Sequence, residues 1–151
     1  MKYCTRTVTW RFQDGSDLLP NLKPLPKVIV RSPETVFSEY QSLFADEVKE
    51  KFVVFWLSSS NRVLGFEIIT TGLLNSSLTH PREVFRGAIV ATAAAVIIAH
   101  NHPSDNQEPS SEDLSITKQI VEAGKIIGIP VHDHIIFTNV GYTSFAERGL
   151  M

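Results

Sequence analysis

The sequence predicts an α/β fold in which a mixed β-sheet is flanked by helices. Strand-like apolar runs alternate with amphipathic helical segments, and the expected elements follow the order β-β, α-β, α-β. The first two runs are placed to pair as a hairpin, whereas the later runs are separated by helices. With 151 residues, 43% of them hydrophobic, the chain has the length of one domain and enough apolar side chains to bury a core.

Residues 1–30 are expected to form a β-rich extension and a connector ahead of a domain over residues 31–151. The segment TRTVTWRF at residues 5–12 alternates between apolar and polar side chains, which predicts a half-buried strand or edge ribbon. Its apolar face carries Val8, Trp10 and Phe12. Three prolines then mark an extended connector: Pro20, Pro24 and Pro26.

The domain is expected to begin with a helix that packs on the sheet. Ser32 followed by Pro33 is typical of a helix start. An apolar stripe at helical spacing follows, made of Val36, Phe37, Tyr40, Leu43 and Phe44.

The remaining elements are predicted from apolar runs and the turn residues between them. KFVVFWL at 51–57 and VLGFEIIT at 63–70 are joined by the turn SSSN and should form a hairpin. A helix from near Pro81 to about Ala93 leads to a buried strand at 94–100. The expected elements after this strand are a helix at 110–127, a strand at 130–137 and a terminal turn near 144–150.

Residues 98–113, IAHNHPSDNQEPSSED, have the residue types and spacing of a zinc site. His100 and His102 lie two apart at a strand end, so their imidazoles point to the same side of the sheet. The proline-containing turn that follows cannot continue the strand, and the chain regains order at Ser110, from which a helix carries Asp113 back. Three protein ligands leave one tetrahedral position for a water of lowered pKa, as in catalytic zinc sites.

Two simpler interpretations of these residues stay open. Either histidine alone is explained as a hydrogen-bonded residue at the end of a strand. The pattern S-x-x-D from Ser110 to Asp113 is also that of a helix capping box, which requires no metal.

The segment HNHPSDNQEPSSED resembles the H-x-H, P-S-x-x-D core of the JAMM (JAB1/MPN) metalloproteases, in the form found in their RadC-like branch. Further segments resemble that branch in the same order: HPREVFRGAI at 80–89, EAGKIIGI at 122–129, DHIIF at 133–137 and ERGL at 147–150. The resemblance covers roughly residues 31–150. It implies the three-layer JAB1/MPN architecture, which is similar to that of cytidine deaminases.

The resemblance also implies a zinc-dependent hydrolase that cleaves an amide, peptide or isopeptide bond in a peptide or a protein conjugate. Zn²⁺ would be held by His100, His102 and Asp113, and Ser110 would support the oxyanion. The general base would be Glu50, which matches the family's carboxylate just before the first sheet strand. Alternatively, Glu50 belongs to a solvated, mixed-charge helix end, and Glu83 is the nearest rival, although acids at a helix start are favoured by the dipole alone.

A second H-x-H pattern occurs in VHDH, at His132 and His134. It is open to interpretation as a second metal site, but a structural role is favoured. Asp133 and His134 match the strand of the RadC-like proteins, whereas His132 stands where those proteins usually have an apolar residue. His80, before Pro81, is expected to be a loop residue.

A second class of function is a DNA-repair or DNA-processing accessory domain of RadC type that binds nucleic acid or a DNA-processing partner. RadC-like proteins usually carry a helix-hairpin-helix region in front of this domain, and residues 1–30 are expected to be too short and too β-like for one. A third class, a degenerate scaffold, is disfavoured because all five residues of the family motif are present.

Composition narrows the choice of partners and compartment. A net charge of −2 without a Lys/Arg cluster argues against strong binding to duplex DNA, unless a homodimer brings scattered basic residues together. The single cysteine, Cys4, excludes an internal disulfide and fits a reducing compartment. No apolar run has membrane-spanning length and no signal sequence is evident, so a cytoplasmic protein without a membrane partner is expected.

Overall fold

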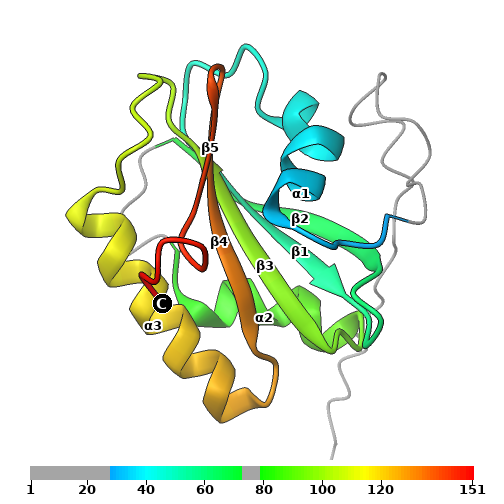
Figure 1. The fold of residues 1–151 in the computed structure, drawn as a ribbon. Coiled ribbons are helices and arrows are strands. Elements are labelled where there is room, and N and C mark those ends of the chain that lie inside the picture. Colours follow the sequence, from blue (N-terminus) through cyan, green and yellow to red (C-terminus); the bar gives the residue numbers. More distant parts are fainter. Residues whose placement is uncertain (1–27, 73–78) are drawn as a thin grey trace, which may run out of the picture.

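The computed structural model describes residues 28–72 and 79–151, and they form a five-stranded mixed sheet with helices on both faces (Figure 1). The predicted fold class is thereby confirmed. The strand order is β2-β1-β3-β4-β5, and all neighbouring pairs are antiparallel except β3 and β4, which are parallel. The strands are β1 (Lys51–Leu57), β2 (Val63–Thr71), β3 (Ala95–Asn101), β4 (Val131–Thr138) and β5 (Gly141–Ser144).

The helices divide the buried side chains into two cores, one on each face of the sheet. α1 (Pro33–Tyr40) and the short 3₁₀ helix η2 (Gln41–Leu43) cover one face, where Tyr40 packs on Phe55. α2 (Pro81–Val90) and α3 (Ser111–Ile127) cover the other (Figure 1). Because side chains alternate along a strand, neighbouring residues of β1 and β3 enter opposite cores. This arrangement explains why both strands are buried along their whole length.

The predicted hairpin is confirmed, since β1 and β2 pair in antiparallel fashion with Phe55 opposite Phe66. The predicted helix at 110–127 is also confirmed, with Ser110 as its N-cap and Gly128 as its left-handed C-cap at φ 81°. Gly tolerates this backbone conformation because it has no Cβ.

Two helices end earlier than predicted. α1 stops at Tyr40, whose φ of −117° and ψ of 7° leave the helical region, and a 3₁₀ turn still brings Leu43 and Phe44 into the core. α2 stops at Val90 rather than near Ala93, because Thr92 adopts a left-handed conformation with φ 51°. In both places the apolar pattern continues although the backbone has left the α-helix.

The strand β5 was not predicted. It pairs with β4 just before the terminal turn. The turn expected near 144–150 is confirmed, and it follows the strand. His80 is the N-cap of α2, where its Nδ1 accepts a hydrogen bond from the backbone of Arg82. The predicted strand and connector of residues 1–27 lie outside the described residues.

None of the helices described in residues 28–72 and 79–151 is long and apolar enough to cross a membrane.

Candidate metal centre

His100 and His102 come together at the end of β3. Val96, Ile98 and His100 alternate onto the face covered by α2 and α3, so His100 is fully buried there. His102 follows the strand, and its backbone N–H donates to the carbonyl of Phe137 at 2.9 Å. The Nε2 atoms of the two histidines lie 3.0 Å apart.

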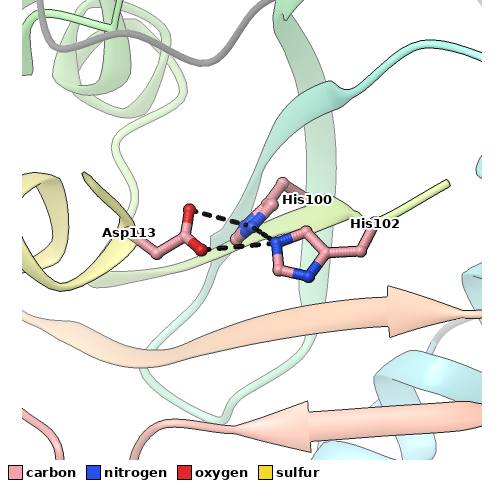
Figure 2. A group of neighbouring side chains, drawn as sticks. All are labelled: His100, His102 and Asp113. Carbon is pink, nitrogen blue, oxygen red and sulfur yellow. Dashed lines mark hydrogen bonds and ion pairs between the residues drawn. The ribbon is translucent and has the colours of Figure 1, made fainter. Parts of the chain in front are cut away.

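Asp113 reaches the same point from the first turn of α3. One carboxylate oxygen lies 3.1 Å from His100 Nε2 and the other 3.3 Å from His102 Nε2. Figure 2 shows each oxygen directed toward one of the two imidazoles. The backbone N–H of Ser110 donates to Asp113 Oδ2 at 2.8 Å, so the helix cap also orients the carboxylate.

A carbonyl fixes the orientation and the tautomer of His102. Its Nδ1 lies 2.6 Å from the backbone oxygen of Asn106, which can only accept, so Nδ1 carries the proton. In the neutral imidazole the lone pair is then on Nε2, facing Asp113. In the protonated ring Nε2 donates a hydrogen bond to Asp113, which raises the pKa of His102; burial opposes this increase, and the charge of Glu50 adds to it.

Asp113 is ionised in this environment. Burial favours the neutral acid, but hydrogen bonds that the protonated rings of His100 and His102 donate, together with the Ser110 N–H, lower the pKa of the carboxyl far below its ordinary value. Asp113 as a whole residue is only 2% exposed. A buried carboxylate facing two imidazole nitrogens creates a site that favours a cation.

The three side chains are close enough together to hold one metal ion, since one ligand atom from each lies within 4.8 Å of the others. With ligand bonds of about 2.0 to 2.1 Å, two ligand atoms of a tetrahedral zinc lie about 3.3 to 3.4 Å apart. The separations among the three side chains, 3.0, 3.1 and 3.3 Å, are close to that value. Among the described residues, His100, His102 and Asp113 form a group that could hold a metal ion.

Glu50 lies beside this group although it is distant in sequence. Asn101, next to His100 on β3, holds the backbone on either side of Glu50: its Oδ1 accepts from Lys51 N at 2.7 Å and its Nδ2 donates to Lys49 O at 3.2 Å. The backbone carbonyl of Glu50 accepts from Gly72 N at 2.7 Å. Sequence reasoning missed Asn101, because nothing in the sequence separates it from other polar residues at a strand end.

An open cavity of about 400 Å³ adjoins the group, and Glu50, His102 and Ser110 are among the residues that line it. Two further acids line it: Glu108 is paired with Arg148 at 2.9 Å, and Glu112 accepts from the Ser111 hydroxyl at 3.0 Å.

Glu83, the rival to Glu50, is on α2. Its carboxylate lies 3.1 Å from Arg86, and it does not contribute to the lining described for this cavity. The structure thus places Glu50, and not Glu83, at the cavity. The catalytic role of Glu50 stays a prediction.

Ser110 forms the capping box that its sequence pattern predicted. Its Oγ accepts from the backbone N–H of Asp113 at 3.1 Å. Accepting this bond uses an oxygen lone pair and leaves the hydroxyl proton able to donate. Capping and support of an oxyanion are therefore compatible for the exposed Ser110, and its catalytic role stays a prediction.

The two histidines of VHDH have different surroundings. The register between β3 and β4 passes from Val131 to Asp133, so His132 is an extra residue at an irregularity and is exposed. His134 is fully buried, with Nε2 2.8 Å from His100 Nδ1. Burial and the neighbouring His100 lower the pKa of His134 well below its ordinary value. His134 thus contacts the first site, and in the described chain this pair forms no second cluster of three ligands.

Comparison with known proteins gives consistent matches. A family described as the RadC-like JAB domain matches residues 30–150. A UPF0758 protein of Symbiobacterium thermophilum is 47% identical over 128 residues, which are 85% of this chain and 55% of that protein. Another, from Methanosarcina mazei, is 40% identical over 126 residues, covering 83% and 55% of the two chains. A third, from Salinibacter ruber, is 48% identical over 122 residues, covering 81% and 52%. The chain spans about half the length of these curated relatives.

Proposed function

The chain belongs to the RadC-like JAB domain family, and we propose that it is a zinc-dependent hydrolase that cleaves an amide, peptide or isopeptide bond. The observation that carries the proposal is the convergence of two imidazole nitrogens and one buried carboxylate within 3.0 to 3.3 Å of one another, beside an open cavity. Such a ligand set leaves one tetrahedral position open, as catalytic zinc sites do.

Zinc suits the donors better than magnesium or calcium does. His100 and His102 offer imidazole nitrogens, which suit zinc and other transition metals, whereas the other two ions prefer oxygen ligands. When bound, zinc supplies Lewis acidity to a substrate carbonyl and lowers the pKa of a coordinated water to about 7.

Two side chains at the cavity would carry out proton transfer and stabilise the developing negative charge. Glu50 would take a proton from the attacking water and pass it to the leaving amine. Ser110 would donate its hydroxyl to the oxygen on which negative charge develops. Their positions support these roles, since both side chains line the cavity next to His102 and Asp113.

A peptide or protein conjugate is the proposed substrate class. The cavity is open, so an amide within a longer chain has access to the ligand group. The net charge of −2 offers little electrostatic attraction to nucleic acid, so we propose no strong nucleic-acid partner.

The proposal is tested by incubating zinc-loaded protein with a panel of unstructured peptides, isopeptide-linked conjugates and small amides. Cleavage should disappear on treatment with a chelator and return with added zinc, and Asp113→Ala should be inactive. His132→Ala is the matched control, because it removes an exposed histidine outside the site. Zinc-loaded protein that cleaves no member of the panel, or cleavage that persists in Asp113→Ala, would contradict the proposed activity.

A further inference from the structure

Two buried side chains that are not metal-ligand candidates connect His100 to Asp113. Thr117, one turn after Asp113 on α3, donates its hydroxyl to the backbone carbonyl of Asp113 at 2.5 Å. The same hydroxyl oxygen lies 2.6 Å from His134 Nδ1. His134 Nε2 in turn lies 2.8 Å from His100 Nδ1. The chain of contacts thus runs from α3 through β4 to β3.

The hydrogen bond from Thr117 to the Asp113 carbonyl determines which atom donates between Thr117 and His134. A hydroxyl has one proton, and Thr117 uses it for the Asp113 carbonyl, which can only accept. Thr117 Oγ1 must therefore accept from His134, so the proton of His134 is on Nδ1.

His134 is held as a neutral ring in one orientation. It is fully buried, stacked on Phe145 with ring centroids 4.5 Å apart and in edge contact with Phe52 at 5.8 Å. An imidazolium is costly in such apolar surroundings. With its proton on Nδ1, the neutral ring offers the Nε2 lone pair, so His100 donates from Nδ1. The lone pair of His100 is then on Nε2, which faces Asp113.

We propose that Thr117 and His134 are positioning residues that hold His100 in the tautomer able to bind a metal ion through Nε2. This inference builds on the metal centre of the proposed function. Outer partners of this kind fix ring orientation and tautomer, and their loss typically costs about 10- to 100-fold in metal affinity.

Removal of the Thr117 hydroxyl has a defined consequence. In Thr117→Val, which is similar in size, His134 Nδ1–H has no acceptor at this position. The alternative tautomer of His134 places the proton on Nε2 and donates to His100 Nδ1. His100 must then carry its own proton on Nε2, where it blocks the metal position. Thr117→Ser retains the hydroxyl and is the matched control.

The test combines zinc affinity with a direct determination of the tautomers. Chelator competition should show affinity reduced by about 10- to 100-fold in Thr117→Val and close to wild type in Thr117→Ser. In ¹⁵N-histidine-labelled, metal-free protein at mildly alkaline pH, NMR should show wild-type His100 and His134 both protonated on Nδ1. In Thr117→Val both should be protonated on Nε2. Thermal unfolding of the metal-free proteins verifies that the variants are folded.

Wild-type His134 protonated on Nε2 would overturn the inference, and this measurement requires no variant. The inference would also be overturned if folded Thr117→Val kept the wild-type tautomers and zinc affinity. Equal losses of zinc affinity in Thr117→Val and Thr117→Ser would overturn it as well. If wild-type protein takes up no zinc, the proposed function fails, whereas the tautomers of the metal-free protein still decide the role of Thr117 and His134.

Discussion

Phe52 on β1 pairs with His100 on β3, and this register carries Glu50, two residues before Phe52, to the end of the sheet where His102 lies. Antiparallel pairing therefore brings together two residues that are far apart in sequence. Asn101 strengthens the arrangement because its side chain bonds to the backbone of both Lys49 and Lys51.

This relationship predicts the behaviour of Glu50→Gln. The substitution removes a carboxylate that can accept a proton but leaves the three ligands in place, so zinc content should be unchanged. The rate of amide hydrolysis should fall roughly 10²- to 10⁴-fold. Glu83→Gln, on α2, is the control and should retain activity. The assignment of Glu50 is wrong if Glu50→Gln retains full activity while Glu83→Gln loses it.

The two roles of Ser110 are separable by substitution. Ser110→Ala should reduce the free energy of unfolding by about 1 kcal/mol, because it removes a helix cap, and should also slow hydrolysis. Ser110→Asn keeps a capping oxygen and should recover stability but not the rate. Urea denaturation and hydrolysis assays measure the two effects. Full activity in Ser110→Ala would mean that the hydroxyl has no role in the reaction.

Gly124→Ala should destabilise the protein although alanine favours helices. A Cβ at this position of α3 would lie 2.6 Å from the carbonyl oxygen of Ile129 and 3.1 Å from Phe85. Overpacking costs about 1 to 3 kcal/mol and the gain in helix propensity is about 1 kcal/mol, so a net loss of about 1 kcal/mol is expected. Ser115→Ala, at an exposed position of the same helix, should show no loss in urea denaturation. A Gly124→Ala variant as stable as wild type would mean that α3 and its C-terminal turn move apart easily.

DNA binding separates the hydrolase from a DNA-processing accessory domain. With a net charge of −2, the protein should bind single- or double-stranded DNA poorly at physiological salt, with a shallow dependence on salt concentration. Fluorescence anisotropy with labelled oligonucleotides measures both quantities. Submicromolar binding that weakens steeply as salt increases would favour the accessory domain and direct attention to a homodimer that combines basic surfaces.

The sequence predicted the sheet, the hairpin and the three helices, because apolar periodicity and caps are local signals. It did not predict β5, a four-residue strand, GYTS, with little apolar character. β5 forms because its backbone pairs with the edge of β4. This pairing depends on the tertiary structure and not on a local sequence pattern.

At the candidate site, the metal-ligand group was predictable from the sequence, whereas the residues that support it were not. Histidine spacing and the family motif indicated the ligand group that the structure brings together. Three supporting residues, Asn101, Asn106 and Thr117, were missed because their contacts depend on how strands and helices pack. The spacing of Thr117 from Asp113 is equally typical of an ordinary helix face.

The most direct test of the central claim is elemental analysis of protein purified without chelators. The wild-type protein should contain about one zinc per chain. His100→Ala should lose the metal because it removes a buried ligand, whereas His132→Ala should retain it. Folded wild-type protein that contains no transition metal and takes up none from added zinc, with His100 and His102 intact, would contradict the claim.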